Sequence, residues 1–194
     1  DVVWNAEKSF QNYSRSCKNM EQYNIKHYLT NDILGGECRV VEINDQMFFP
    51  IFKVGSTSLE HVADKVYSNE EIGACENVQV LIRDPVDRFV SGINKYCSLH
   101  KLDVHETCTM IKGGKVIDRH IAPQFVWLFH LSKFYSGNIT LRPFEDIKQV
   151  TAVHRGREPS KVIVVPPEEL IKTDMRLINM IGQTVDLKSL VKGL

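Results

Sequence analysis

Apolar and polar positions follow two different periods along this chain, and each period predicts a type of secondary structure. Between residues 4 and 23, apolar side chains recur at steps of three and four, which is typical of one face of an amphipathic helix. Residues 39–43 and 46–52 are instead rich in β-branched and aromatic side chains, with Asn44 and Asp45 between them. We therefore expect a β-hairpin over residues 39–52, in which Pro50 marks a bulge or an unpaired edge.

The rest of the chain alternates between short apolar runs and longer amphipathic segments. The short runs, bounded by polar turns, predict strands over residues 77–82, 139–143 and 161–165. Proline in the first turn or glycine after the last turn helps to delimit five predicted helices, over residues 56–67, 85–99, 103–112, 123–135 and 166–182. This order predicts an α/β fold with a mostly parallel central sheet and helices on both faces.

Length and charge limit the classes of protein that need to be considered. A chain of 194 residues suits one domain, which we divide into an N-terminal helical extension over 1–38 and an α/β core over 39–194. The formal net charge is zero, so no overall field favours nucleic acid or an acidic membrane surface. No apolar run approaches the roughly 20 residues of a membrane-spanning helix. We therefore expect neither nucleic acid nor a membrane as a partner, and any anion site must be local.

The cysteines bear on the cellular compartment. There are five, an odd number, and none of them has CxxC spacing. Free thiols in a reducing, cytoplasmic compartment are the interpretation that we favour. The alternative is one or two disulfides in the lumenal catalytic domain of a membrane-anchored parent protein.

The first segment that carries chemistry is a predicted strand that runs through Lys53-Val-Gly-Ser-Thr-Ser into a helix. Gly55 allows backbone N–H groups to approach a ligand closely, and the hydroxyls of residues 56–58 add donors. Lys53 adds a full positive charge. The alternative is an ordinary helix start capped by Ser56, with Lys53 simply exposed. The segment is not a Walker loop, because that motif places its lysine after the glycines.

The second segment follows the predicted strand 77–82 and reads Arg83-Asp-Pro-Val-Asp-Arg-Phe-Val-Ser91. Arginine can hold a phosphate through two parallel hydrogen bonds, and a serine can donate one more. If the helix starts at Pro85, Ser91 lies nearly two turns into it, on a face that can look back toward Arg83. The alternative is a surface network of arginines with Asp84 and Asp87.

Together the two segments resemble the sulfotransferases that use 3′-phosphoadenosine 5′-phosphosulfate (PAPS), in particular the carbohydrate sulfotransferase branch. Lys53-Val-Gly-Ser-Thr-Ser-Leu is similar to the 5′-phosphosulfate loop of that family, and Arg83 with Ser91 is similar to its 3′-phosphate motif. A third stretch, Asp118-Arg-His-Ile-Ala-Pro-Gln124, resembles an xHxxPQ signature of the same branch. The chain departs from the family at Phe52, which replaces the usual proline, and in the short interval between Lys53 and Arg83.

The resemblance implies a P-loop-like three-layer fold and an enzyme that moves a sulfuryl group from PAPS to a hydroxyl or amine. The acceptor would be a carbohydrate or another hydroxyl-bearing molecule, the product adenosine 3′,5′-bisphosphate (PAP), and no metal would be needed. The residues that the resemblance assigns to binding PAPS are Lys53, Val54, Gly55, Ser56, Thr57, Ser58, Leu59, Arg83 and Ser91.

The resemblance implies two catalytic roles. Lys53 would neutralise charge on the leaving oxygen, and a general base would take the proton of the acceptor. For the base we favour His120, with His61, Glu60 and Glu71 as alternatives.

Two other functions are kept as hypotheses. A non-catalytic nucleotide-binding module of the same fold would bind PAP without transferring sulfate. A P-loop-like kinase would bind ATP with Mg²⁺, but it would require the Walker lysine that this chain lacks.

Overall fold

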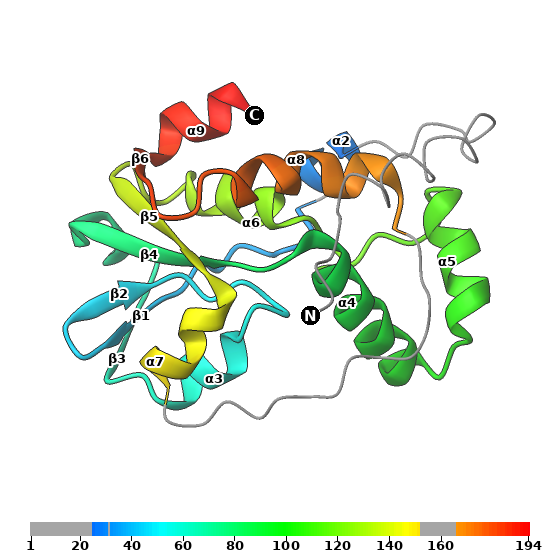
Figure 1. Cartoon of the computed structure of the whole chain (residues 1–194), viewed down its shortest axis with the longest axis horizontal. Helices are drawn as coiled ribbons and strands as arrows, with labels where there is room; N and C mark the ends of the chain where they lie inside the picture. Colours follow the sequence, from blue (N-terminus) through cyan, green and yellow to red (C-terminus); the bar gives the residue numbers. More distant parts are fainter. Residues whose placement is uncertain (1–24, 31, 152–165) are drawn as a thin grey trace, which may run out of the picture.

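The computed structural model describes residues 25–30, 32–151 and 166–194, which form an α/β structure around one sheet (Figure 1). The six strands of the described chain lie in the order β3-β1-β2-β4-β5-β6. Their bounds are β1 Val40–Ile43, β2 Gln46–Phe48, β3 Lys65–Tyr67, β4 Asn77–Ile82, β5 Asn138–Pro143 and β6 Thr184–Asp186.

The sheet is mixed, which corrects the expectation of a mostly parallel one. Strands β2, β4 and β5 pair in parallel, but β1 pairs antiparallel with both β2 and β3, and β6 pairs antiparallel with β5. The parallel pairs at the centre need the crossover helices that the sequence pattern revealed. Of the strands with antiparallel partners, β1 belongs to a hairpin with β2, β3 lies in a segment that was predicted as helix, and β6 was not predicted. The P-loop-like character of the fold stays a prediction.

The hairpin predicted over residues 39–52 is confirmed. Asn44 and Asp45 both have positive φ values, 49° and 62°, so the two-residue turn belongs to the type that suits the twist of paired strands. Ile43 pairs with Gln46, and β2 then ends at Phe48, two residues before Pro50. The strand ends early because proline has no N–H group to donate to a neighbouring strand.

The helix predicted over residues 56–67 is only half as long as expected. Helix α3 covers Ser56–His61, and the chain then returns to the sheet as β3. The backbone of Asp64 donates to Glu42, and its carboxylate accepts from the backbone N–H of Asn44 at 2.9 Å. Contacts made across about twenty residues therefore decide the conformation of this segment, and local helix propensity does not.

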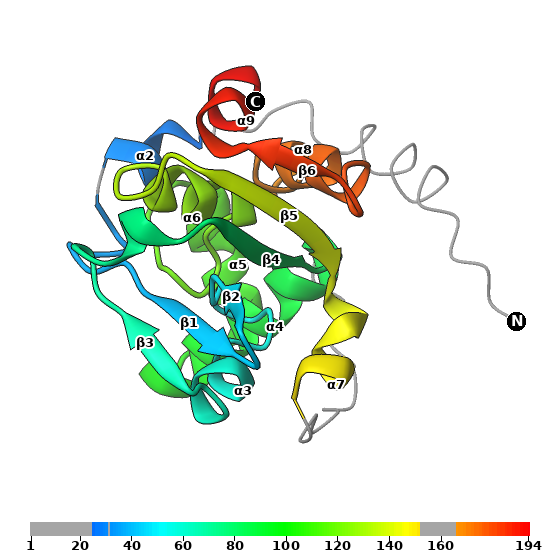
Figure 2. The ribbon, with the colours of Figure 1, turned by 90° about the vertical axis from the view of Figure 1, so that its left-hand side faces the viewer.

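The remaining helices cover both faces of the sheet. In the end-on view, α2 and α6 lie on one face, and α3 and α7 lie on the other (Figure 2). The bounds are α2 Lys26–Thr30, α4 Pro85–His100, α5 Val104–Lys112, α6 Gln124–Leu131, α7 Ile147–Val150, α8 Glu168–Ile178 and α9 Leu187–Gly193, with 3₁₀ turns η1 Ile72–Ala74 and η2 Phe144–Asp146.

Aspartates start three of these helices. The side chains of Asp84, Asp103 and Asp186 each accept a hydrogen bond from a backbone N–H three residues later, at the first turns of α4, α5 and α9. The first two helices were predicted, and they begin and end within a residue of expectation. Strand β6 and helix α9 were not predicted, because each is short and carries no strong apolar period.

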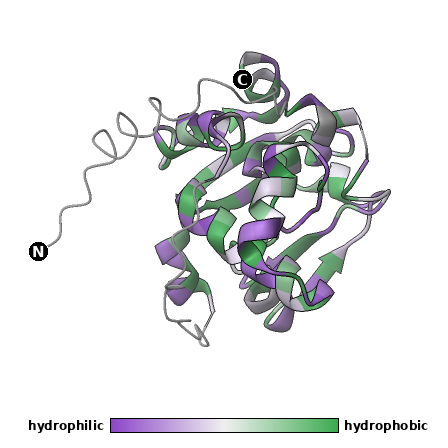
Figure 3. Cartoon of the chain, turned by 90° about the vertical axis from the view of Figure 1, so that its right-hand side faces the viewer, coloured by the Kyte–Doolittle hydropathy of each residue, from purple (hydrophilic) through white to green (hydrophobic). Residues whose placement is uncertain are grey.

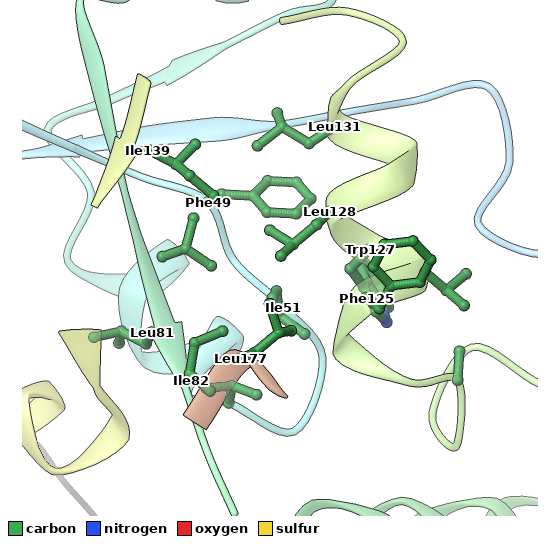
Figure 4. Packing of buried hydrophobic residues seen from close by; sticks show 14 of the residues in the cluster. Phe49, Ile51, Leu81, Ile82, Phe125, Trp127, Leu128, Leu131, Ile139 and Leu177 are labelled. Carbon is green, nitrogen blue, oxygen red and sulfur yellow. The ribbon is translucent and has the colours of Figure 1, made fainter. Parts of the chain in front are cut away.

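The core lies between the sheet and α6. Phe49 packs against Leu128 of this helix, while Ile51 lies beside Leu177 of α8 (Figure 4). Apolar residues follow the central strands, and hydrophilic residues are interspersed along the surrounding helices (Figure 3). Every residue of α6 except Phe129 is buried, so the aromatic rings of Phe125 and Trp127 belong to the core.

Some expectations lie outside the described residues, namely the helix over 4–23 and the strand over 161–165. The described part of the N-terminal extension packs on the core, because Tyr28 of α2 is buried and α2 contacts α6. None of the described helices is both long enough and apolar enough to cross a lipid bilayer.

Candidate functional site

The candidate site lies where the three parallel strands β2, β4 and β5 end. Their carboxyl ends lead into the loop 49–55, the start of α4, and the turn η2 followed by α7, all at the same end of the strands (Figure 1). In open α/β sheets, ligands bind in the crevice outside the carboxyl ends of such strands. Lys53 and Arg83, the two cations singled out from the sequence, both lie at this edge.

The loop after β2 has an unusual backbone. Lys53 has a φ value of 66° and Gly55 a φ value of 75°, both in the left-handed region. Between them, the backbone N–H of Val54 donates to Ile51 at 3.0 Å and closes a tight turn. A side chain at Gly55 would also collide with Ile147 of α7, because its Cβ would lie 2.8 Å from the Cδ1 atom. Gly55 is therefore favoured by its conformation, and a larger residue would also force the Ile147 side chain to shift.

The hydroxyl groups after Gly55 have different environments. Gly55 is the N-cap of α3, so the alternative in which Ser56 caps the helix is wrong. Ser56 is buried, Ser58 is half-buried and Thr57 is exposed. Val54 and Leu59 are each 1% exposed and belong to the core, so of these two residues only the backbone could meet a ligand.

Arg83 is held in place by its backbone and by its side chain. Its Nη1 atom donates to the carbonyl of Lys53 at 3.0 Å, and its guanidinium lies over the ring of Phe144, 5.0 Å from the centroid. Burial lowers the pKa of Arg83, and the nearby carboxylates of Asp87, Asp84 and Glu145 oppose this shift. The alternative of a surface network is therefore too simple, because Asp84 caps α4 and makes no ion pair with Arg83.

A buried amide fixes the backbone of Arg83. Gln124 is fully buried at the start of α6, where its Oε1 accepts from the N–H of Arg83 at 2.9 Å and its Nε2 donates to the carbonyl of Arg83 at 2.9 Å. Asp174 of α8 in turn accepts from the backbone N–H groups of Gln124 and Phe125, at 2.7 and 2.9 Å. The pKa of Asp174 is raised, because the effect of burial outweighs the Arg88 charge and these hydrogen bonds, which act to lower it.

Arg88 supports the same loop from inside the protein. Its side chain is 1% exposed, and its Nε donates to the carbonyl of Phe52 at 3.1 Å. Burial lowers the pKa of Arg88 to about 10, and its Nη2 atom is buried without a hydrogen-bond partner. Arg88 and Arg83 thus donate to the consecutive carbonyls of Phe52 and Lys53 and stabilise the turn.

The ring of His120 contacts this loop through Phe52. The ring of Phe52 is 5.4 Å from the ring of His120 and 4.9 Å from that of Trp127, measured between centroids. The guanidinium of Arg119 lies over the same ring, 5.1 Å from its centroid. Phe52, the residue that departs from the resemblance, therefore connects His120 with the loop that carries Lys53.

Ser91 is located by a close contact between α4 and the segment of His120. A Cβ at Gly92 would overlap the carbonyl oxygen of His120 and lie 2.9 Å from its carbonyl carbon, so only glycine permits this approach. Ser91 precedes Gly92 and is half-buried. Its hydroxyl makes no hydrogen bond within the described residues, either to Arg83 or to another residue.

The other candidate bases are not brought to the site. His61 and Glu60 are exposed at the end of α3, and Glu60 is close enough to Arg39 to add to the raised pKa that Arg39 owes mainly to Glu37. Glu71 accepts from the backbone N–H of Ser68 at 2.9 Å and pairs with Lys65 of β3. Among the proposed bases, His120 has a ring contact with the loop of Lys53.

Sequence reasoning missed the role of four residues that support the site. They are Gln124, which holds the backbone of Arg83, together with Asp174, Arg88 and Asp118. Gln124 and Asp118 flank His120 in the third motif, so the motif could have revealed them. Asp174 had no local signal. Within the described ranges, no three side chains of His, Cys, Asp or Glu are grouped to hold a metal ion.

Comparison with known proteins adds no assignment. No protein-family model, no curated protein and no solved structure matches this chain.

Proposed function

We propose that this protein is a PAPS-dependent sulfotransferase whose nucleotide site is formed by the loop of Lys53 and the start of α4. The observation that carries the proposal is the convergence of Lys53 and Arg83 at one edge of the sheet, where the Arg83 side chain donates to the Lys53 carbonyl. Two cations at the ends of adjacent parallel strands suit a ligand with two separate anionic groups. PAPS is such a ligand, because it carries a 3′-phosphate and a 5′-phosphosulfate.

In this proposal each cation has its own anion. Lys53, with the hydroxyls of residues 56–58, binds the 5′-phosphosulfate, and Arg83 with Ser91 binds the 3′-phosphate. Helix α3 has only six residues, so its dipole contributes little and side-chain charge carries the site. Arg83 is already ordered by Gln124, which reduces the conformational entropy that binding must overcome.

The reaction would be an in-line transfer. The acceptor oxygen attacks sulfur and forms the new S–O bond, while the bond between sulfur and the bridging oxygen breaks and its electron pair leaves with PAP. Lys53 stabilises the charge that develops on that oxygen, and His120 takes the proton of the acceptor hydroxyl. A carbohydrate is the acceptor that we propose, on the basis of the sequence resemblance.

The test begins with the nucleotide. Thermal melting is measured with PAP, with AMP and with ATP–Mg²⁺, on the wild type, on Arg83→Lys and on Arg83→Ala. PAP at one hundred times its Kd should add about 2.7 kcal/mol, which corresponds to a rise in Tm of roughly 5 to 10 °C. Arg83→Lys keeps the charge but loses the planar fork, so it should retain part of the shift, and Arg83→Ala should lose it.

The matched control is Arg176→Ala, which removes an exposed arginine of α8 and should leave the PAP shift intact. Transfer from radiolabelled PAPS to a panel of oligosaccharides then tests catalysis. PAP binding without any transfer would favour the non-catalytic module. A shift with ATP–Mg²⁺ alone, or no shift at all, would refute the proposal.

A further inference from the structure

Asp118 and His120 form a hydrogen-bonded pair beside the loop of Lys53. The Nδ1 atom of His120 lies 2.7 Å from Oδ1 of Asp118, and the backbone N–H of His120 donates to the same oxygen at 2.7 Å. The two side chains are 13% and 22% exposed, so water is partly excluded from the pair. The Nε2 atom of His120 makes no hydrogen bond within the part of the chain that the structure describes.

We propose that Asp118 is a positioning residue that keeps the proton of neutral His120 on Nδ1, so that Nε2 is the atom that accepts the acceptor's proton. This inference rests on the proposed function for its catalytic meaning. The tautomer itself is a property of the protein that can be measured without any substrate.

The chemistry of the pair determines the tautomer. An ionised carboxylate only accepts hydrogen bonds, so a neutral imidazole facing it must present an N–H group. The opposite tautomer would set the lone pair of Nδ1 against the carboxylate oxygen. The second hydrogen bond, from the backbone, fixes Asp118 whatever the ring does, so the carboxylate is in place before a substrate binds.

The surroundings keep Asp118 ionised and the ring fixed. Burial raises the pKa of Asp118, but the hydrogen bonds from His120 outweigh it and the pKa is lowered overall, with Arg119 contributing. Tyr96 is the titratable group that faces the pair from α4, and its own pKa is raised by burial and by Asp118. On the loop side the ring meets Phe52, whose neighbour Lys53 is the nearest charge along that segment.

The proton of the acceptor moves first to His120 and then to water. As the acceptor oxygen bonds to sulfur, its proton moves to Nε2 and the ring becomes an imidazolium. Asp118 stays ionised and stabilises that cation through the Nδ1–H bond. After PAP and the sulfated product leave, the proton on Nε2 passes to water and the ring returns to its starting tautomer.

The tautomer is tested by NMR on the full chain. Ring ¹⁵N shifts are measured at pH 8.5, where an imidazole is ordinarily neutral, and the signals of His120 are identified by their loss in His120→Gln. We expect protonated Nδ1 and unprotonated Nε2 in the wild type. Asp118→Asn can turn an NH₂ group toward Nδ1, so it should shift the ring toward protonated Nε2. Asp118→Glu restores a carboxylate and should recover part of the wild-type pattern.

Kinetic measurements then test whether Asp118 contributes to catalysis through His120. In Asp118→Asn we expect kcat to fall by about 100-fold or more, while the thermal shift caused by PAP is unchanged. Tyr96→Phe is the matched control, because it removes the titratable neighbour but leaves the pair, and it should keep the wild-type tautomer. Finding protonated Nε2 in the wild type would overturn the inference, and so would a tautomer switch that leaves kcat unchanged. Failure of the proposed function would instead appear as absent PAP binding, whatever the NMR result.

Discussion

Gly92 offers the sharpest test of how the site is assembled. Helix α4 and the segment 118–121 are in backbone contact at this residue, and a Cβ there would lie 2.9 Å from the carbonyl carbon of His120 and 3.3 Å from Cα of Ile121, besides overlapping the His120 oxygen. All three atoms belong to the backbone, so no rotamer change can relieve the clash. In Gly92→Ala the segment must therefore move by roughly 1 Å before the Cβ clears the carbonyl oxygen of His120.

Two opposing effects determine how much stability Gly92→Ala loses. Alanine in a helix is favoured over glycine by up to about 1 kcal/mol. Overpacking costs about 1 to 3 kcal/mol, and a clash with rigid backbone belongs at the upper end of that range. We expect a net loss near 2 kcal/mol, which in a domain of this size lowers Tm by roughly 4 to 8 °C.

The assay combines thermal and urea unfolding with sulfate transfer. Gly193→Ala is the matched control, because a Cβ at that helical position meets no atom within 4 Å, and it should be as stable as the wild type or slightly more so. The sulfate transfer that we propose should fall in Gly92→Ala because His120 is displaced. If Gly92→Ala were as stable as Gly193→Ala, the packing of α4 against His120 described above would be wrong.

Three further predictions concern Lys53, Asp174 and His130. Lys53→Gly should be about 1 kcal/mol more stable than Lys53→Ala, because only glycine relieves the left-handed backbone, while both variants lose the PAP-induced thermal shift; equal stabilities would argue against strain at this residue. Asp174→Asn should cost about 1 to 3 kcal/mol in urea unfolding and shrink the PAP shift, since the hydrogen bonds that orient Gln124 are weakened; an unchanged PAP shift would show that Gln124 does not depend on this carboxylate. Burial lowers the pKa of His130, so the stability that the neutral ring contributes is present above about pH 6.5 and is lost as the pH falls through the lowered pKa. The unfolding free energy lost between pH 7.5 and 5 should therefore be smaller in His130→Gln than in the wild type. An identical loss in both proteins would count against this assignment.

Local sequence signals predicted much of the fold. The hairpin turn at Asn44 and Asp45, the strand 77–82 and the helices capped by Asp84 and Asp103 all depend on residues within a few positions of one another. Strand β3 was predicted as helix because its conformation depends on pairing with β1. The mixed character of the sheet likewise depends on edge strands too short to show a period.

The candidate site divides in the same way. Lys53, Arg83 and His120 lie in motifs that can be read from the sequence, and the structure brings all three to the loop at the end of β2. The supports behind them could not be predicted, because Gln124 and Asp174 join residues 41 and 50 positions apart through buried hydrogen bonds. Burial of a polar residue is a tertiary property, and single positions in a sequence do not reveal it.

The hydrogen bonds from Asp174 through Gln124 to Arg83 also set an order of events during synthesis. Chains emerge from the ribosome N-terminus first, at about 5 to 20 residues per second. The loop of Lys53 and the start of α4 are therefore exposed well before residue 174 is available to fix Gln124. Nascent chains that end before α8 should lack an ordered Arg83, so nucleotide retention by ribosome-bound chains would mark the moment at which the segment from α8 onward docks.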